Sequence, residues 1–414
     1  MSNKRKLSFA ALLDRHAQVA VHVGLRPIPG QQIILSAPIE ALPLVRLICK
    51  HAYMAGASLV TPLLTDGECT LARYRHASDA SFDIASAWLS DGTAAAFKEG
   101  AARIAISGDN PGLLAGQDPS RVSRAAAAAG KASKPAMEYV TTSRVNWSIC
   151  AYATRSWAKT AFPELSEKAA VAKLWRAIFA ASRADAPDPV AAWMEHNAVL
   201  KSRVKILNDR NFASLRFRGP GTDLLVGLAD GHKWAGGSST TPGGAQFNAN
   251  VPTEEVFTTP HSRRVDGWVS STKPLSLHGN IVEGIRVRFE SGKIVEASAA
   301  KGESALLNLI KTDEGASHLG EIALVPHSSP ISASGLLFFN TLFDENAACH
   351  MAVGQSYAKC MHDGVNLSKD DLIARGANQS NVHVDWMIGS GAVDVDGICP
   401  DGTVVPVMRG CEWV

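Results

Sequence analysis

The feature that most constrains the fold is an alternation, in the first half of the chain, between short apolar runs and longer segments with helical periodicity. The apolar runs span residues 33–38, 58–64, 102–107 and 146–152. The helical segments span residues 10–23, 41–55, 79–98 and 120–129. Runs of about five to seven residues are typical of strands, and their alternation with helices predicts a parallel sheet with helices packed on it.

This predicted sheet carries no signature for binding phosphate. No G-x-G-x-x-G follows the first predicted strand, and no G-x-x-x-x-G-K-[ST] occurs anywhere in the chain. Glycine-rich loops of these two kinds are what bring backbone N–H groups close to nucleotide phosphates. We therefore interpret the first half as a scaffold or a substrate-gating domain. It ends in two further helical segments, at 165–181 and 189–206.

The second half changes character from residue 213 onward. Residues 214–218 and 285–289 alternate polar and apolar side chains, and a Glu-Ser-Gly-Lys turn after the second run predicts a hairpin with 294–297. The pattern is typical of an antiparallel-rich α+β domain. A chain of 414 residues is long enough for more than one core. We therefore expect an α/β domain at 1–205, followed by an α+β domain at 206–414 that holds any catalytic site.

Composition excludes several classes of function. The net charge is +2 and the basic residues form no long runs, so a nucleic-acid surface is not indicated. The chain has no run of about 18 apolar residues, and its first 23 residues lack a signal peptide's apolar core. The seven cysteines are scattered and form no C-x-x-C pair, which favours free thiols and a cytoplasmic location.

Carboxylates and imidazoles gather in four segments of the second half, each rich in small or apolar residues. The segments are 250–261, 318–326, 343–357 and 381–389. A buried charge is costly unless it is paired or binds a metal, so such a concentration raises the hypothesis of a metal site. In the last segment, His383 and Asp385 are two residues apart on a predicted strand and would project from the same face.

The third segment has the highest density of polar groups. We expect residues 346–358 to form a helix with Asp344 near its cap, which would place His350 and Tyr357 on one face. Cys349 adjoins His350 and could serve as a nucleophile, but a small buried thiol is the favoured interpretation. Each segment taken alone is weak evidence for a metal site, because solvated glutamates, surface His-x-Asp pairs and core tyrosines are all common.

Together, the four segments resemble the thermophilic-type metalloaminopeptidases, the family of aminopeptidase T, aminopeptidase S and PepS. The similarity covers most of the chain in length and layout, and it is specific in the second half. The motifs that carry it are P-T-E-E-V-F-T-T-P-H, L-G-E-I-A-L-V, F-D-E-N-A-A-C-H-M-A-V-G-Q-S-Y and H-V-D-W-M-I-G.

The resemblance implies a two-domain, dimeric enzyme with two divalent metal ions, zinc or cobalt or also manganese. The implied ligands are Glu255, Glu321, Glu345, His350, His383 and Asp385. Glu321 corresponds to the carboxylate that bridges both ions, and Tyr357 to a tyrosine beside them. Glu254 is the rival of Glu255, but the family often has glycine at that position.

The implied activity is release of N-terminal amino acids from peptides, by a metal-bridged hydroxide that attacks the first peptide bond. We expect Tyr357 to stabilise the resulting oxyanion by a hydrogen bond. Two alternatives stay open at this point. One is a metal-binding protein without catalysis, and the other is an amidase or carboxypeptidase that uses the same ions.

Overall fold

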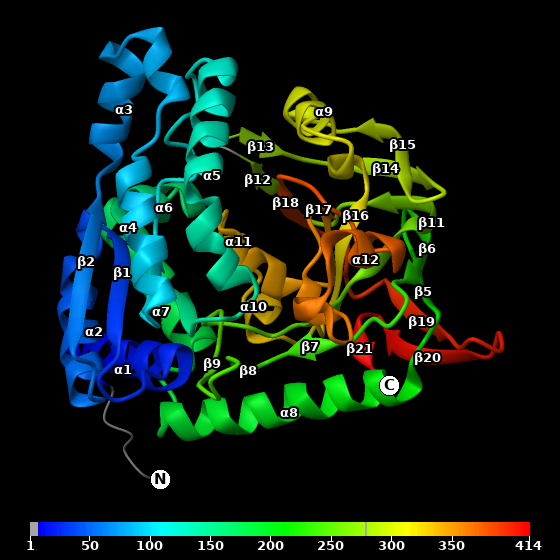
Figure 1. Ribbon diagram of the computed structural model, residues 1–414, viewed down its shortest axis with the longest axis horizontal. Coiled ribbons are helices and arrows are strands. Elements are labelled where there is room, and N and C mark those ends of the chain that lie inside the picture. The colour runs from blue at the N-terminus through cyan, green and yellow to red at the C-terminus, as the bar shows by residue number, and fades with distance from the viewer. Residues whose placement is uncertain (1–6, 278–279) are drawn as a thin grey trace. The chain divides into compact units, whose positions relative to one another are not determined.

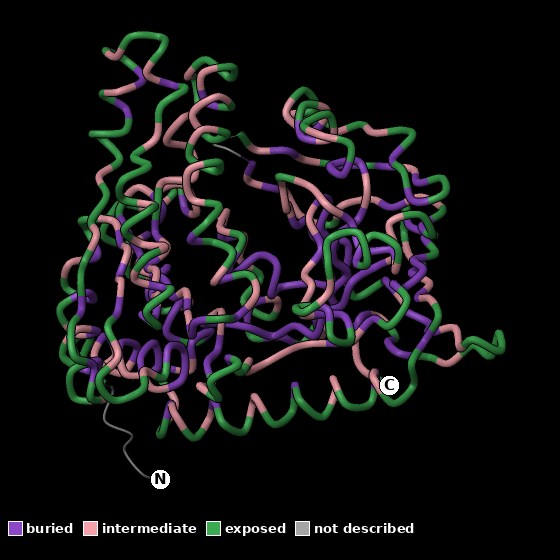
Figure 2. The backbone as a smooth tube through the Cα atoms, in the orientation of Figure 1, coloured by how far each residue is buried: buried purple, intermediate pink, exposed green. Residues whose placement is uncertain are grey.

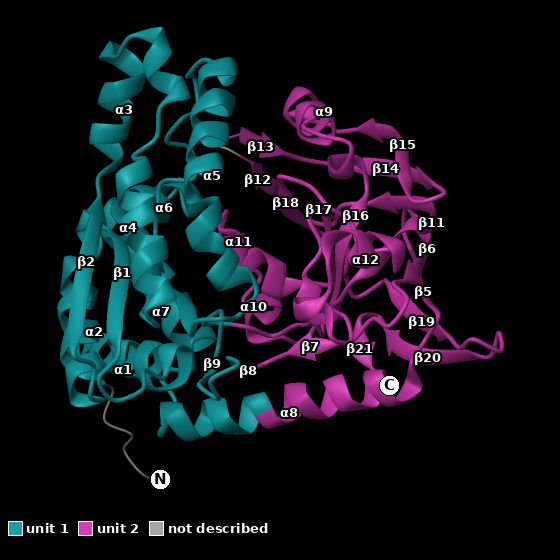
Figure 3. Cartoon of the chain, viewed as in Figure 1, with its two compact units in different colours: residues 1–197, 238–252 teal, residues 198–237, 253–414 magenta. Residues whose placement is uncertain are grey.

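The chain divides into two compact units, which we describe separately. The computed structural model describes residues 7–277 and 280–414. Unit 1 comprises Met1–Asn197 and Ser238–Pro252, and unit 2 comprises Ala198–Gly237 and Thr253–Val414 (Figure 3). The helix α8, Pro189–Arg210, contributes residues to both units.

Unit 1 is built on a four-stranded parallel sheet with the order β2-β1-β3-β4. Figure 1 labels its neighbouring strands β1 and β2. The strands are β1 Gln32–Pro38, β2 Leu59–Thr65, β3 Ala102–Ser107 and β4 Trp147–Ala151. Two short strands, β8 Ser239–Thr240 and β9 Gln246–Phe247, pair separately. The parallel sheet predicted from the alternating apolar runs is thus confirmed.

The strands of unit 1 alternate with helices, as the periodicity predicts. The helices are α1 Phe9–Val19, η1 Ala20–Leu25, η2 Ile39–Ala41, α2 Leu42–Met54, α3 Gly67–His76, η3 Asp79–Asp83, α4 Ala87–Lys98, α5 Pro119–Thr141, α6 Arg155–Ala161 and α7 Glu167–Ala181. Side-chain caps fix several starts: Asp118 accepts hydrogen bonds from two backbone N–H groups at the start of α5. The sequence prediction for α5 was too short, because its buried face continues to Val140.

Unit 2 contains two antiparallel sheets. The larger has the order β15-β14-β11-β6-β5-β19-β20-β21, and the smaller has the order β18-β17-β16-β10-β7. The strands of the larger sheet are β5 Ser214–Gly219, β6 Thr222–Leu228, β11 Pro260–Ser270, β14 Arg286–Glu290, β15 Lys293–Ser298, β19 Asp394–Ile398, β20 Val404–Arg409 and β21 Glu412–Trp413. The predicted hairpin is β14–β15, and its turn residues Ser291 and Gly292 both have positive φ.

The smaller sheet lies in the core of unit 2. Its strands are β7 Ala235–Gly236, β10 Val256–Thr258, β16 Leu319–Leu324, β17 His350–Gly354 and β18 His383–Met387. Every residue of β16 and β17 is buried, as the purple tube in Figure 2 shows. Apolar side chains of both sheets, among them Val226, Val287 and Ile322, form one hydrophobic cluster. This packing gives the smaller sheet a rigid base.

Short helices and one hairpin complete unit 2. They are β12 Leu275–Leu277, β13 Asn280–Val282, α9 Glu303–Ile310, η4 Gly315–Ser317, α10 Pro330–Ala333, α11 Thr341–Asp344, η5 Glu345–Ala347, η6 Ala358–Cys360, η7 Gly364–Asn366 and α12 Lys369–Ala374. The combination of a parallel α/β half and an antiparallel-rich α+β half is the predicted fold class.

The helix predicted at 346–358 is wrong. Residues 350–354 form the strand β17, which pairs with β16 on one side and β18 on the other. The reason is that a short apolar run buried on both faces has no alternation, so periodicity cannot distinguish it from a buried helix.

The predicted role of Asp344 as the cap of that helix is therefore also wrong. Asp344 is the last residue of α11, and its carboxylate accepts hydrogen bonds from the backbone N–H groups of Phe338 and Asn340, both at 2.9 Å. It closes the loop in front of α11. The loop in turn fixes where the following residue, Glu345, begins η5.

The cysteines and the helices agree with two expectations from composition. All seven cysteines are free, and Cys150, Cys349, Cys360 and Cys411 are buried. In the described part of the chain, no helix combines the length and the apolar character that a membrane span needs.

Candidate metal centre

The smaller sheet of unit 2 brings together residues from four distant stretches of the chain. Glu255 immediately precedes β10, Glu321 lies in β16, His350 begins β17, and His383 and Asp385 lie in β18. These four strands are consecutive neighbours in the sheet. Figure 1 labels β16, β17 and β18 among them. Neighbouring strands lie about 4.8 Å apart, so side chains on a shared face come within reach of a common ligand.

The register places these side chains on one face. Glu321 of β16 is opposite Ala352 of β17, which is opposite Asp385 of β18. His350 is two residues from Ala352, and His383 is two residues from Asp385, so alternation returns both imidazoles to that face. The sheet pairing alone therefore assembles two carboxylates and two imidazoles.

The distances define two overlapping groups that share one carboxylate. In the first group, Nε2 of His350 lies 3.1 Å from Oε2 of Glu255 and 3.8 Å from Oε1 of Glu321. In the second, Nε2 of His383 lies 3.6 Å from Oε2 of Glu321 and 3.6 Å from Oδ1 of Asp385. Within each group the potential ligand atoms lie within 4.8 Å of one another. Glu321 thus presents one oxygen to each group.

The orientation of both imidazoles fits metal ligation. Nδ1 of His350 lies 3.1 Å from the carbonyl oxygen of Ala348, and Nδ1 of His383 lies 2.7 Å from that of Gln355. A carbonyl can only accept, so each Nδ1 donates a proton there, and Nε2 is the nitrogen left to bind a metal ion when the ring is neutral. This second hydrogen bond is the usual way in which a metal-binding histidine is oriented.

The carboxylates are buried without a lysine or arginine to balance them. Glu255, Glu321 and Asp385 are less than a tenth exposed. Within the described residues, their ion pairs involve only histidine, and no lysine or arginine lies within ion-pair distance. Buried charges of one sign are costly unless they are paired or bind a metal. The donor set therefore fits divalent cations.

Several pKa shifts have the same origin. Burial raises the pKa of Glu321, and the neighbouring carboxylates of Glu255 and Asp385 add to the rise. Burial would lower the pKa of His383, but the adjacent Asp385 and Glu321 outweigh it and raise the pKa to about 9. Both shifts reflect an excess of negative charge in the cluster.

Glu345 faces the same cluster from outside the sheet. It begins η5, is 9% exposed, and accepts a hydrogen bond from its neighbour Asn346. Burial and the charges of Glu255 and Asp385 raise its pKa well above the ordinary value. Although neither of the two groups above includes it, Glu345 interacts with the same charges as their members.

Glu254 and Glu255 are both buried, but they are placed differently. Glu255 contacts His350, whereas Glu254 does not belong to either potential ligand group. The backbone N–H of Glu254 donates to Oδ1 of Asn346 at 2.7 Å. Asn346 also donates from its Nδ2 to the carbonyl of Leu342. Asn346 thus ties the Glu254 segment to the Glu345 segment, a role that sequence reasoning missed because an asparagine within D-E-N resembles a turn residue.

Tyr357 lies beside the centre, just after β17. The centroid of its ring is 4.7 Å from that of His383 and 6.2 Å from that of Phe257. Burial and the carboxylates of the cluster raise the pKa of its phenol well above 10, so the hydroxyl stays protonated and can donate a hydrogen bond. Cys349 lies in the apolar core instead, with its Sγ against the backbone of Val325, which confirms it as a packing residue.

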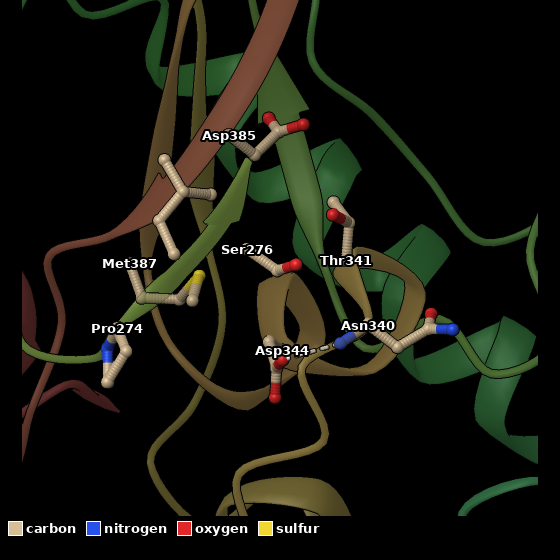
Figure 4. A pocket seen from close by; sticks show the side chains of 8 residues that line it. Pro274, Ser276, Asn340, Thr341, Asp344, Asp385 and Met387 are labelled. Atoms are coloured by element: carbon tan, nitrogen blue, oxygen red, sulfur yellow. Dashed lines mark hydrogen bonds between the residues drawn. The ribbon is translucent and has the colours of Figure 1, made fainter. Parts of the chain in front are cut away.

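A small pocket adjoins one member of the cluster. Asp385 and Met387 of β18 form part of its wall. Figure 4 shows Ser276, Asn340 and Thr341 around the same space, with Asp344 bonded to the backbone of Asn340. No motif in the sequence marks this pocket, because its wall combines residues from three separate segments.

Fold and site together define a metalloprotease, and comparison with known families agrees. Residues 9–413 match the family model described as thermophilic metalloprotease (M29). The chain belongs to this family, as its four motifs predicted.

The individual relatives are similar over nearly the whole chain. Aminopeptidase T of Thermus aquaticus is 51% identical over 407 residues, which cover 98% of this chain and 99% of the relative. Aminopeptidase AmpS of Bacillus subtilis is 44% identical over 406 residues, with 98% and 99% covered. A solved structure, wild-type AmpT from Thermus thermophilus, has a TM-score of 0.93 at 50% identity and covers 98% of this chain and 100% of its own.

Proposed function

We propose that this metalloprotease is a metal-dependent aminopeptidase whose centre holds two divalent ions between β10, β16, β17, β18 and η5. The main observation that supports this proposal is the position of Glu321, whose two carboxylate oxygens face two different imidazoles. Relatives named as aminopeptidases support the reaction class, since this chain matches them almost from end to end. The enzyme is accordingly a hydrolase of the exopeptidase class.

The ligands we assign are the buried polar residues of the cluster. They are Glu255, Glu321, Glu345, His350, His383 and Asp385. Four carboxylates balance the charge of two divalent ions, and two neutral imidazoles add nitrogen donors. This mixture of oxygen and nitrogen donors suits zinc, cobalt or manganese. Glu321 is the residue that would be shared by both ions.

The remaining side chains suggest how a peptide is hydrolysed. Divalent ions in such a site supply Lewis acidity and lower the pKa of water, which provides the nucleophile for attack on the scissile carbonyl. Tyr357 presents a protonated hydroxyl beside His383, where it would donate to the oxyanion as negative charge develops. A free α-amine would bind one of the two ions, which would account for action at the N-terminus.

The test is hydrolysis of aminoacyl-p-nitroanilides by the chain, first stripped with chelator and then reloaded with zinc or cobalt. We expect activity to disappear with chelator and return with metal, and N-acetylated substrates to resist cleavage. Metal binding without any turnover would instead indicate a binding protein without catalysis. Cleavage of only the N-acetylated substrates would indicate an amidase.

Three further expectations belong to this proposal. The second domain, 206–414 by sequence, would carry the chemistry, and the first, 1–205, would act as scaffold and gate for substrates. The enzyme would work as a homodimer, as the family resemblance implies. Its seven free cysteines favour a reducing compartment such as the cytoplasm.

A further inference from the structure

We propose that Lys359 determines specificity by favouring peptides whose second residue carries a carboxylate, as the free C-terminus of a dipeptide does. The inference rests on the proposed aminopeptidase function, because it concerns the part of the substrate beyond the scissile bond. It assigns a role to a residue outside the cluster of metal ligands.

Lys359 is linked to the centre through one aromatic ring. Its Nζ lies 5.4 Å from the centroid of the Tyr357 ring and 5.0 Å from that of the Phe257 ring. The Tyr357 ring in turn lies 4.7 Å from the ring of His383. Cation–π attraction to the two aromatic faces holds the ammonium in place without neutralising it.

The same residues lie on one accessible side of the centre. His350 is 1% exposed and Glu321 is 4% exposed, so neither offers a route to solvent. The side chain of His383 is 19% exposed, and Tyr357 and Lys359 are both partly exposed. A peptide that approaches the ligands on the side of His383 passes Tyr357, and Lys359 flanks that approach.

The ammonium of Lys359 has no anionic partner within the described residues. It takes part in none of the ion pairs that the described residues form, whereas Arg264 is paired with Asp230. A cation that is held in place and unpaired beside a binding site is suited to an anionic group of the ligand. The available anion on a short peptide is a carboxylate.

The spacing fits a carboxylate on the second residue. An extended peptide advances about 3.5 Å per residue, so the α-carboxylate of a dipeptide lies roughly that distance past the scissile carbonyl. We assign the oxyanion of that carbonyl to Tyr357, and Nζ of Lys359 lies 5.4 Å from the centroid of the Tyr357 ring. A longer peptide would carry its C-terminal carboxylate beyond this point.

The experiment compares dipeptides with and without the charge in one enzyme preparation. X is the amino acid whose p-nitroanilide the metal-loaded enzyme cleaves fastest. The substrates are X-Gly, X-Gly-amide, X-Glu-amide and X-Gln-amide. The first pair tests the α-carboxylate, and the second tests a side-chain carboxylate at the same residue.

We expect the wild type to prefer X-Gly over X-Gly-amide roughly fivefold in kcat/KM, mainly through KM, as for a partly exposed charge pair. Lys359→Met should bring the ratio near one, and Lys359→Arg should keep it. The matched control, Lys369→Met on the exposed start of α12, should leave it unchanged. A preference confined to X-Glu-amide over X-Gln-amide would assign Lys359 to acidic side chains instead of C-termini.

Two results would overturn the inference, and only the second would also overturn the proposed function. Equal acid-to-amide ratios in wild type and Lys359→Met, with both substrates cleaved, would remove Lys359 from substrate selection and leave the aminopeptidase intact. Failure of the metal-loaded wild type to cleave any p-nitroanilide or dipeptide would overturn the proposed function and the inference with it.

Discussion

Nε2 of His383 lies 3.6 Å from Oε2 of Glu321, while the other oxygen of that carboxylate faces a second imidazole. The two residues come from strands that are not neighbours, because β17 lies between β16 and β18. Their contact therefore depends on the register of all three strands. One sheet therefore positions four of the six proposed ligands, and the chemistry of the centre can be tested one side chain at a time.

Tyr357→Phe removes the hydroxyl that we place beside the oxyanion. Loss of one such donor typically lowers kcat by about 10²- to 10³-fold. We expect a fall of that order, with KM and bound metal little changed, because the aromatic ring keeps its contacts with His383 and Phe257. Steady-state kinetics on a p-nitroanilide, with metal analysis on the same sample, measure both quantities. Full kcat in a metal-loaded Tyr357→Phe enzyme would exclude the role.

Metal removal should destabilise unit 2. The carboxylates of the cluster repel one another when no cation is bound, and an ion that binds only the folded state stabilises it. At a free concentration 100 times Kd, each ion contributes about 2.7 kcal/mol. Calorimetry with and without chelator should show a higher Tm for the metal-loaded chain. An identical Tm in both states would argue against ions bound at this cluster.

Asp344→Ala should destabilise the loop in front of α11. The substitution leaves the N–H groups of Phe338 and Asn340 without their acceptor, and an unsatisfied buried donor costs about 1–3 kcal/mol. We also expect weaker metal binding, because the hydrogen bonds of Asp344 hold the backbone directly before Glu345 in place. Thermal unfolding and metal titration measure the two effects. Asp91→Ala, at an exposed site in α4, is the control and should change stability little.

His16 makes the stability of unit 1 depend on pH. Burial lowers its pKa from 6.5 to about 4, and its ring lies between the carbonyl of Ala151 and the hydroxyl of Ser182. Between these two pKa values the unfolded chain binds one more proton than the folded chain. The contribution of His16 is therefore complete above pH 6.5 and declines by about 1.4 kcal/mol per pH unit as the pH falls toward 4.

Hydrogen exchange of peptides that cover α1, corrected for the intrinsic rate, measures this dependence. His16→Gln removes the titrating group and should flatten the slope of opening free energy against pH by one proton. A slope that is the same in both proteins would mean that His16 does not titrate on unfolding.

The sequence predicted those parts of the fold in which the spacing of apolar residues follows a single helical or strand period. The four parallel strands of unit 1 stand out because each apolar run is bounded by turn residues, and the β14–β15 hairpin is marked by its Ser-Gly turn. The strand β17 was mistaken for a helix because its residues are buried on both faces and show no alternation. Here the partners that decide the conformation, β16 and β18, are distant in sequence.

The proposed ligands of the candidate site could be predicted from the sequence, but the residues that hold their segments in place could not. The six proposed ligands lie in motifs that the sequence displays directly. The roles of Asn346 and Asp344 depend on backbone groups of other segments, such as Glu254 and Phe338, and no pattern in the sequence reveals these bonds. Lys359 is a similar case, because its relation to Tyr357 follows from the chain's path after β17.

The most direct test of the central claim is the metal content of the purified chain, measured by elemental analysis for wild type and Glu321→Ala. Glu164→Ala, at an exposed position, serves as the control. If Glu321 is shared by two ions, we expect close to two equivalents in wild type and control, and a fall toward zero in Glu321→Ala. An unchanged metal content in Glu321→Ala would contradict the account.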